Sequence, residues 1–210
     1  IHCGLVGSEM CIRDRKYKVQ MYEDKTLLNE AKLFSEWYAP TKINKFQIRK
    51  FKKGYQNEVK KLLSKLNFKN DTFVHRDFHV SNLMYVKNNI AVIDSQDALI
   101  GNKAYDLASL VDDVRFETSN KLKNKILNNY FKKLKKTEIN KFVNDFEILS
   151  VLRNLKIIGI FMRLASRDNK KKYVKMIPYA WEMINYRMKK NREFVNLKLI
   201  LKRNFPKFVK

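Results

Sequence analysis

A short stretch of β-type sequence, enclosed by helical patterns on both sides, constrains the fold of this chain most strongly. Residues 72–75 (TFVH), 83–86 (LMYV) and 90–94 (IAVID) are rich in the β-branched and aromatic residues that favour strands. Residues 87–89 (KNN) have a composition that suits a tight hairpin turn. Alternation in 90–94 lets apolar residues anchor the second strand and leaves Asp94 at its end. The sequence therefore predicts an α+β fold that is mainly helical and contains one small β-hairpin.

Helical periodicity fills most of the remaining chain. Apolar residues recur every three or four positions over 25–38, a helix that we expect to end before Pro40, and over 51–66. Residues 146–164 are apolar on nearly all sides, so we expect this segment in the core. Further helices are predicted over 104–116, 121–136, 138–167 and 177–191. A chain of 210 residues with 45% hydrophobic content can bury such a core, which indicates one domain or a large part of one.

The chain carries a large positive charge, because 45 basic and 21 acidic residues give +24 at pH 7. This charge would suit nucleic acid, an anionic membrane surface or a phosphate-bearing ligand, and a genome poor in G and C would produce it whatever the function. Lysines in 121–136 resemble a nucleic-acid patch. The apolar residues of this segment follow helical spacing, however, so the lysines are better explained as its solvent side. These apolar residues are Leu122, Ile126, Leu127, Tyr130, Phe131 and Leu134.

The apolar runs and the first residues of the chain bear on where the protein is located. No run of about 18 apolar residues exists, and no segment has the pattern of a secretory signal, so we expect a cytoplasmic protein that makes no membrane contact. Cys3, Cys11 and His2 make too small a ligand set for a zinc site. Residues 1–15 lack periodicity and an initiator methionine and resemble a translated artefact at a read edge. We expect them to be non-native and residues 16–210 to form the folded unit.

The β-type stretch also contains an ordered set of polar residues. Residues 75–82 (HRDFHVSN) fit the pattern H-R-D-x-x-x-x-N of the catalytic loop in kinase-like phosphotransferases, and Asp94 follows twelve residues later. Phosphoryl transfer needs a carboxylate that accepts the proton of the attacking hydroxyl and oxygen ligands that hold magnesium against the phosphates. This pattern predicts Asp77 as the catalytic base, with Asn82 and Asp94 as metal ligands that the hairpin brings together.

Three neighbouring residues have less specific signals. His75 is expected to pack as a structural residue. His79 could contact phosphate or substrate, or it could stabilise the loop. Asp106 follows Tyr105 at the start of a helix, where a carboxylate is favoured by the helix dipole, or it could accept hydrogen bonds from the catalytic-loop backbone, which we favour.

Two longer segments carry a resemblance to a known family. Residues 74–84 (VHRDFHVSNLM) and 92–113 (VIDSQDALIGNKAYDLASLVDD) resemble the aminoglycoside phosphotransferase family, which has a protein-kinase-like fold. The resemblance covers about residues 20–200 and corresponds to the carboxyl-terminal lobe of that fold. It implies ATP and Mg²⁺ as cofactors, with Asp77 as the base and with Asn82 and Asp94 as ligands of the nucleotide-bound metal.

The chain departs from the family pattern in two ways. Ser95 stands where an aromatic residue usually follows the metal-binding aspartate. No glycine-rich phosphate loop of either common type occurs in the chain. The resemblance therefore implies that the amino-terminal nucleotide lobe is missing, in which case the chain alone would be an inactive fragment.

Within the family, the form HRD rather than HGD, the run IDSQDA and residues 152–187 resemble the bacterial sugar kinases of cell-wall recycling. The acceptor would then be the anomeric hydroxyl of N-acetylmuramate or N-acetylglucosamine. Plausible substrate-side groups are Asp97, Arg153, Arg163 and Arg167, each of which could equally form a salt bridge on a helix. A cation near the acceptor would help to recognise the lactyl carboxylate of muramate.

Two other functions remain as alternatives. One is a kinase of the same family acting on an aminoglycoside or another small-molecule hydroxyl, although a polycationic acceptor needs acidic residues that are sparse here. The other is a non-catalytic basic module that binds nucleic acid, and its affinity should then fall steeply with salt. Because the lysines follow helix surfaces, we expect a small-molecule sugar and ATP as partners rather than nucleic acid.

Overall fold

The structure is a computed structural model that describes residues 19–189 and 191–209. The prediction for residues 1–15, with Cys3 and Cys11, lies outside the described residues. The fold is α+β and mainly helical, as predicted. The helices are α2 (Asp24–Leu33), α3 (Lys45–Leu63), α4 (Tyr105–Val111), α5 (Asn120–Phe131), α6 (Lys136–Arg167), α7 (Ile177–Met188) and α8 (Val195–Asn204), and the strands are β1 (Thr72–Val74), β2 (Leu83–Val86), β3 (Asn89–Val92) and β4 (Leu99–Gly101).

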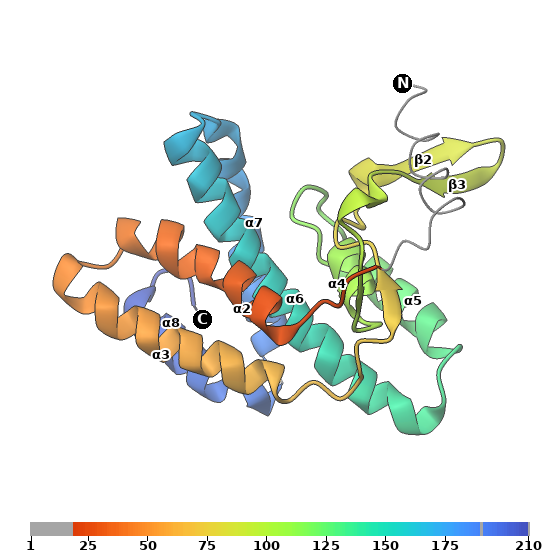
Figure 1. The fold of residues 1–210 in the computed structure, drawn as a ribbon, viewed down its shortest axis with the longest axis horizontal. Coiled ribbons are helices and arrows are strands. Elements are labelled where there is room, and N and C mark those ends of the chain that lie inside the picture. The colour runs from red at the N-terminus through yellow and green to blue at the C-terminus, as the bar shows by residue number, and fades with distance from the viewer. Residues whose placement is uncertain (1–18, 190, 210) are drawn as a thin grey trace.

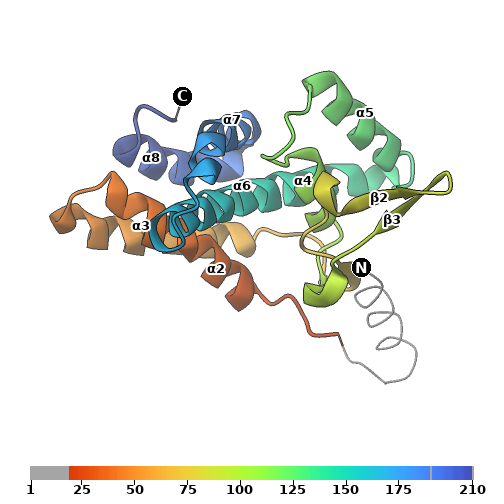
Figure 2. The same cartoon turned by 90° about the horizontal axis from the view of Figure 1, so that it is seen from above.

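Helix α6 forms the centre of the fold. It runs through the middle of the molecule, with α2 and α7 packed along it and with α4 against its first half (Figure 1). Seen from above, α6 reaches from the helical end with α3 and α8 toward the end that carries the hairpin (Figure 2). Most of its side chains from Phe142 to Phe161 are buried, because neighbouring helices cover it on several sides. The prediction that residues 146–164 lie in the core is therefore confirmed.

The crossing of α2 and α6 depends on a glycine. A Cβ atom on Gly159 would lie only 2.3 Å from the carbonyl carbon of Leu33, so the two backbones approach closely. Directly after Leu33 the helix widens into a π-helical turn, Phe34–Tyr38, in which the ring of Phe34 is fully buried and lies 5.7 Å from the ring of Trp181. The helix predicted over 25–38 is confirmed, with a π-helical end that the periodicity did not indicate.

Strands β1 and β4 form a short antiparallel pair. In the chain, β1 precedes the predicted catalytic residues and β4 follows them. Thr72 lies opposite Gly101 in this pair. The N–H of Tyr22 donates to the carbonyl oxygen of Ile100 at 2.7 Å, so the chain before α2 lies along the other edge of β4. The sequence did not predict β4, because its three residues show too little alternation to be recognised as a strand.

The β2–β3 hairpin lies where it was predicted, but two details differ. Its turn contains two residues, Lys87 and Asn88, rather than three, since Asn89 already belongs to β3. Both turn residues have positive φ values, 46° and 64°, which match the twist of a two-residue hairpin. The apolar residues do not anchor the strand: Ile90 is 61% and Val92 41% exposed. The hairpin extends away from the helices in both views (Figures 1 and 2), so no described element covers it.

Several helix ends differ from the predictions. Helix α3 begins at Lys45, well before 51, because the Asn44 side chain caps it by accepting a hydrogen bond from the N–H of Gln47 at 2.9 Å. Helix α4 ends at Val111 rather than 116, because Asp112 leaves the helix to bind buried cations. Helices α5 and α7 end at 131 and 188, earlier than expected. The helix starts at 120, 136 and 177 agree with the predictions within two residues.

The interpretation of α5 needs one correction. Lys121 and Lys125 face solvent as expected, but Lys123 is buried and its ammonium lies 3.0 Å from Asp112. Leu122, assigned to the buried face, is 44% exposed. Lys123 lies one turn before the buried Leu127 and therefore on the same buried face of α5. The Asp112 carboxylate neutralises its charge there, where an apolar side chain was expected.

Candidate functional site

The chain that follows β1 is fixed by a carboxylate from the first turn of α4. One oxygen of Asp106 accepts a hydrogen bond from the N–H of His75 at 2.7 Å, and the other accepts one from the N–H of Arg76 at 3.0 Å. Two consecutive N–H groups facing one anion form a small anion-binding nest. Burial raises the pKa of Asp106, and the two backbone hydrogen bonds oppose that rise. Asp106 therefore accepts hydrogen bonds from the catalytic-loop backbone, which is the role that we favour from the sequence.

Arg76 connects the same loop to two further elements. Its guanidinium donates to the carbonyl oxygen of Asp97 at 3.0 Å and forms an ion pair with Glu30 of α2 at 2.5 Å. Glu30 also pairs with Lys156 of α6 at 2.9 Å and accepts a hydrogen bond from the hydroxyl of Tyr22. Burial raises the pKa of Glu30, but Lys156, Tyr22 and Arg76 together hold it below its ordinary value. A carboxylate in the core therefore ties the loop to α2 and α6.

Asp77 follows Arg76, and its side chain is exposed to solvent. The carbonyl oxygen of Asp77 accepts hydrogen bonds from the N–H of His79 at 3.0 Å and from Nδ2 of Asn82 at 2.9 Å. The second bond fixes the orientation of the Asn82 amide. No described residue donates to Asn82 Oδ1, so this oxygen can accept a cation. The loop thereby presents a carboxylate and an amide oxygen from positions that its own backbone bonds hold in place.

The hairpin brings Asp94 next to Asn82. The carbonyl oxygen of Asn82 accepts the N–H of Ile93 at 3.0 Å, which extends the β2–β3 ladder by one step, and Asp94 is the next residue. His75 Nε2 lies 2.9 Å from the carbonyl oxygen of Ile93. The structure thus places buried His75 as a link between the loop and the strand end. Asp94 is exposed, has a φ of 72°, and accepts a hydrogen bond from Gln96 at 2.9 Å.

The base of the hairpin offers the oxygen ligands that magnesium binds. Mg²⁺ is usually held by one or two carboxylates together with substrate phosphates and water rather than by a cage of protein ligands. Within 19–189 and 191–209, no three or more His, Cys, Asp or Glu side chains converge as a metal site. The amide oxygen of Asn82 and the carboxylate of Asp94 therefore fit a metal ion that arrives bound to phosphates.

His79 lies on the inner side of the loop, two residues after Asp77. It is 7% exposed, and its Nδ1 is buried without a hydrogen-bond partner. Burial lowers the pKa of His79, and the positive charges of Arg115 and Arg153 lower it further, while Asp113 and Asp77 act in the opposite direction. A neutral imidazole is favoured at this position, surrounded by charged side chains from α6 and from the chain after α4.

The remaining candidates are spread more widely. The Asp97 side chain is exposed, and Ser95 begins the short turn Ser95–Asp97 with a half-buried side chain. Arg167 is exposed and pairs with Asp168 at 2.7 Å. Arg163 is half-buried, and its Nε has no hydrogen-bond partner in the described part of the chain. At 1.5 Å per residue, Arg163 lies about 15 Å along α6 from Arg153. The structure gathers His75, Asp77, His79, Asn82, Asp94 and Asp106 in one place, and Arg163 lies further along α6 than Arg153.

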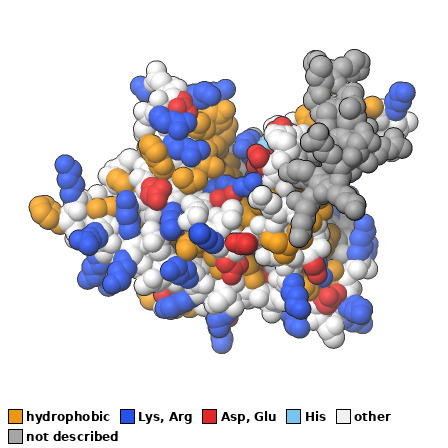
Figure 3. Space-filling view, viewed as in Figure 1, with side chains coloured by type: hydrophobic (Ala, Val, Ile, Leu, Met, Phe, Trp, Pro, Cys, Tyr) orange, Lys and Arg blue, Asp and Glu red, His pale blue; other side chains and the backbone are white. Residues whose placement is uncertain are grey.

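A hollow opens beside this group of residues. Figure 3 shows it between the upright arm, formed by the end of α6 and the turn Lys171–Met176, and the part of the molecule from which the hairpin extends. The wall on the arm side is largely apolar, while histidine, acidic and basic side chains lie at its floor. A small polar molecule that entered the hollow would meet charged groups on one side and an apolar wall on the other.

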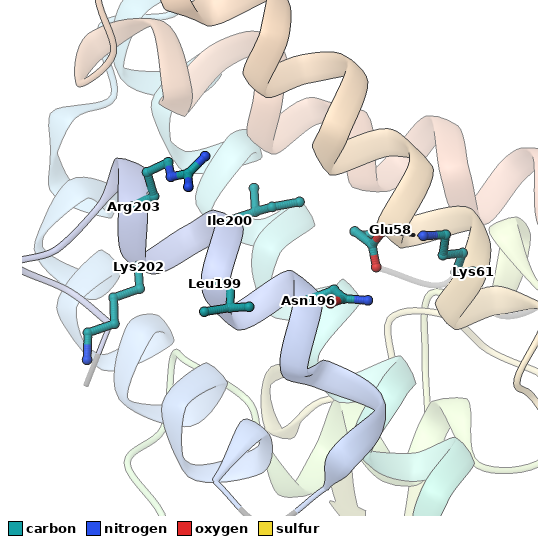
Figure 4. A pocket seen from close by; sticks show the side chains of 7 residues that line it. All are labelled: Glu58, Lys61, Asn196, Leu199, Ile200, Lys202 and Arg203. Atoms are coloured by element: carbon teal, nitrogen blue, oxygen red, sulfur yellow. Dashed lines mark hydrogen bonds and ion pairs between the residues drawn. The ribbon is translucent and has the colours of Figure 1, made fainter.

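A second cavity lies at the opposite end of the molecule. It has a volume of about 620 Å³ between α3 and α8, and its rim carries Lys61, Lys202 and Arg203 beside Glu58 (Figure 4). Figure 1 places α3 and α8 away from the hairpin, so this cavity is separate from the predicted catalytic residues. None of the residues predicted for the site lines it.

Sequence reasoning missed four residues around the site. Glu30 and Lys156 each stand within an apolar helical stripe, and a charged residue in such a position was the signal that could have revealed them. Asp113 and Arg115 bond to each other at 3.1 Å in the turn after α4. No sequence pattern marks these two, because only the fold brings them near His79.

Comparisons with known proteins match most of this chain to phosphotransferases. The phosphotransferase enzyme family matches residues 13–138, which include all of the loop and the hairpin. The chain is 34% identical over 182 residues to an N-acetylmuramate/N-acetylglucosamine kinase of Neisseria meningitidis, a match that covers 84% of this chain and 54% of the relative.

Proteins of the same name from two other species give similar matches. The identity is 29% for Pseudomonas putida, over 78% of this chain and 50% of the relative, and 28% for Pseudomonas aeruginosa, over 84% and 54%. The chain thus spans about half the length of the curated relatives it matches. The extent of these matches confirms the resemblance seen in the sequence: the chain belongs to the phosphotransferase enzyme family.

Proposed function

We propose that this chain carries the phosphoryl-transfer residues of an ATP- and Mg²⁺-dependent sugar kinase whose acceptors are N-acetylmuramate and N-acetylglucosamine. The observation that carries the proposal is the meeting of Asp77, Asn82 and Asp94 at the base of the hairpin, in a chain related to kinases with that name. The reaction would take place in the cytoplasm, where ATP is supplied.

Asp77 would act as the general base. As its carboxylate accepts the proton of the anomeric hydroxyl, the sugar oxygen forms a bond to the γ-phosphorus and the bond from that phosphorus to the oxygen of ADP breaks. Asn82 Oδ1 and the Asp94 carboxylate would hold the magnesium, which, when bound with ATP, neutralises charge on the phosphates. Asp106 and Arg76 would act as positioning residues, because they fix the backbone on the amino-terminal side of Asp77.

The chain matches about half the length of its curated relatives. We propose that residues 16–210 form the carboxyl-terminal lobe and that a nucleotide lobe completes the ATP site in the whole protein. The exposed apolar residues of the hairpin support this division, since Tyr85 is 73% and Ile90 61% exposed close to the predicted metal ligands. A second lobe that covered the hairpin would bury these side chains.

The curated relatives favour an amino sugar over an aminoglycoside as the acceptor, because they are named N-acetylmuramate/N-acetylglucosamine kinases. The composition points the same way, since the chain has 21 acidic against 45 basic residues and a polycationic acceptor needs acidic residues around it.

The proposed function can be tested with the gene product that contains this chain. The protein is incubated with ATP and Mg²⁺ and with each amino sugar in turn, and sugar 1-phosphate is detected by ³¹P NMR. Formation of a 1-phosphate from N-acetylmuramate and N-acetylglucosamine is expected, and kanamycin serves as the comparison acceptor. If neither amino sugar yields a 1-phosphate while kanamycin is phosphorylated, the acceptor assignment is wrong.

A further inference from the structure

The Arg76 side chain bridges the two segments that carry the predicted base and the predicted metal ligand. Arg76 directly precedes Asp77 in the chain, and its Nη1 donates to the carbonyl oxygen of Asp97 at 3.0 Å. Asp97 ends the turn Ser95–Asp97, which begins directly after Asp94. The guanidinium therefore helps to fix how the loop with Asp77 lies relative to the chain that leaves Asp94.

Glu30 of α2 holds the second arm of this guanidinium. Arg76 Nη2 lies 2.5 Å from one oxygen of Glu30, and Lys156 of α6 lies 2.9 Å from the other. The hydroxyl of Tyr22 donates to that other oxygen as well, and the centroid of the Tyr22 ring lies 5.2 Å from Cζ of Arg76. One oxygen of Glu30 thus binds Arg76 while two further groups hold the carboxylate in place.

This contact bears on the backbone next to the base. Arg76 has a φ of 71°, a left-handed conformation that persists in an arginine only where the surroundings enforce it. Asp106 accepts a hydrogen bond from its N–H at 3.0 Å, and Glu30 holds the far end of its side chain. Without Glu30 one of these two constraints is lost, and the backbone that leads into Asp77 would relax toward an ordinary conformation.

Asp94 is held by contacts that do not include Glu30. The N–H of Ile93 donates to the carbonyl oxygen of Asn82 at 3.0 Å, and His75 Nε2 lies 2.9 Å from the carbonyl oxygen of Ile93. These contacts remain in a variant that lacks the Glu30 carboxylate. A change at Glu30 would therefore shift the base relative to the metal ligand without dismantling the metal site.

We propose that Glu30 is a positioning residue for phosphoryl transfer, which holds Arg76 in the strained conformation that directs the Asp77 carboxylate toward the acceptor hydroxyl. The inference rests on the proposed function and adds to it a residue on α2, outside the loop and the hairpin, on which the rate depends. In this role Glu30 contacts neither the sugar nor the nucleotide, so it affects kcat and not binding. Asn82 Nδ2 also donates to the carbonyl oxygen of Asp77 at 2.9 Å, so the loss without Glu30 should be partial.

The test uses the gene product that contains this chain, with N-acetylglucosamine, ATP and Mg²⁺. Glutamine would offer one acceptor oxygen to the three donors that Glu30 binds. Glu30→Gln should lower kcat by roughly 10- to 100-fold, since a misplacement of about 1 Å costs that order of rate, and should leave the KM for the sugar and for ATP nearly unchanged.

Glu58→Gln on α3 is the matched control. The side chains of Glu58 and Glu30 are both 13% exposed, and Glu58 is paired with Lys61 at 2.7 Å. Figure 1 places α3 away from the hairpin, so this variant removes a similar ion pair far from the predicted base. Its kcat should equal that of the wild type.

Two further variants separate positioning from stability. Glu30→Gln leaves Lys156 without its counter-charge, so Glu30→Gln combined with Lys156→Gln removes the unpaired lysine and should show the same fall in kcat. In an Arg76→Gln background, Glu30→Gln should lower kcat little further, because both changes remove the same interaction. Circular dichroism gives the folded fraction of each protein, to which kcat is referred.

Three results would overturn the proposal. The first is a kcat of Glu30→Gln equal to that of the wild type, or one that Lys156→Gln restores, and the second is a full additional loss in the Arg76→Gln background. The third is a raised KM for the sugar at unchanged kcat, which would indicate a substrate contact. If the wild type phosphorylates neither amino sugar, the proposed function fails, and this is observed before any variant is made.

Discussion

Two residues at the site hold backbone conformations that are unfavourable for residues other than glycine. Arg76 has a φ of 71° and directly precedes Asp77, the predicted base. Asp94, the predicted metal ligand, has a φ of 72°. Such conformations cost on the order of 1–3 kcal/mol and persist only where the surroundings enforce them. For Arg76 the surroundings are the Asp106 carboxylate on its N–H and Glu30 on its guanidinium. Contacts from α2 and α4 thus offset a strain that sets the direction of Asp77.

Asp77→Asn is expected to lower kcat by roughly 10²- to 10⁴-fold, the usual contribution of a positioned general base. The backbone carbonyl of Asp77 and its bonds from His79 and Asn82 are retained in the variant, so folding and nucleotide binding should be unaffected. Steady-state kinetics with N-acetylglucosamine and a parallel titration of ATP binding provide the measurement. Asp71→Asn, at an exposed position just before β1, is the control. A kcat within a few-fold of the wild type would show that Asp77 is not the base.

Asp94→Asn is expected to remove the magnesium dependence of ATP binding. Asparagine tolerates the left-handed backbone at this position, so the variant deletes the charge and keeps the local fold. Isothermal titration of ATP with and without Mg²⁺ in the gene product should show affinity that no longer responds to the metal. If Mg²⁺ strengthens ATP binding in the variant as much as in the wild type, Asp94 is not a metal ligand.

At the scale of elements, the sequence predicted those parts of the fold whose own residues determine them. Helices α2, α6 and α7 carry complete apolar stripes, and the hairpin has its strand residues and its turn within twelve positions. Strand β4 was missed because it depends on pairing with β1, in which Thr72 lies opposite Gly101, 29 residues later in the chain. The burial of Lys123 was missed because Asp112, on another element, supplies its counter-charge.

The residues of the site divide in the same way. Some are positioned by the local sequence, and others are brought in by the packing of distant helices. The spacing of Asp77, Asn82 and Asp94 is a property of the loop and the hairpin, and the structure places them together. Glu30, Lys156 and the turn after α4 reach the loop only through the packing of α2, α4 and α6. A motif search identifies the first group, whereas the second group requires the tertiary fold.

Gly159→Ala is expected to destabilise the chain by about 1–3 kcal/mol or more, the usual cost of overpacking, because its new methyl group would lie 2.3 Å from the Leu33 backbone and force α2 away from α6. Gly54→Ala in α3 is a matched control. Its Cβ would lie 3.7 Å from Ile200, an ordinary contact, and alanine should stabilise the helix by roughly 0.5–1 kcal/mol. Urea unfolding followed by circular dichroism measures both variants. Equal stability of the two would contradict the close approach of α2 and α6.

At the scale of the whole molecule, one buried carboxylate joins four elements. Asp112, at the end of α4, is bonded to Lys123 of α5 at 3.0 Å, to Ser150 of α6 at 2.6 Å and to Arg187 of α7 at 2.7 Å. No helix of the described chain is long and apolar enough to cross a membrane. Asp113, which pairs with Arg115, is the next residue in the chain after this network.

Asp112→Asn is expected to destabilise the chain by about 3–5 kcal/mol at pH 7, because it leaves Lys123 and Arg187 buried without a counter-charge. Burial raises the pKa of Asp112, but Arg187 and Lys123 hold it below its ordinary value of 3.8. The unfolded state therefore binds more protons than the folded state below that value, and the stabilisation by Asp112 is present above pH 3.8 and lost as the pH falls through the folded pKa.

The free energy of unfolding of the wild type and of Asp112→Asn is measured in urea from pH 7 down to pH 3. The difference between the two proteins should be largest at neutral pH and should shrink in acid. Asp168→Asn, which breaks the exposed pair with Arg167, should change stability little at any pH. A wild type and an Asp112→Asn variant of equal stability at pH 7 would mean that the two cations find other partners or are reached by water. The end of α4, and Asp113 with it, would then not be held by this network.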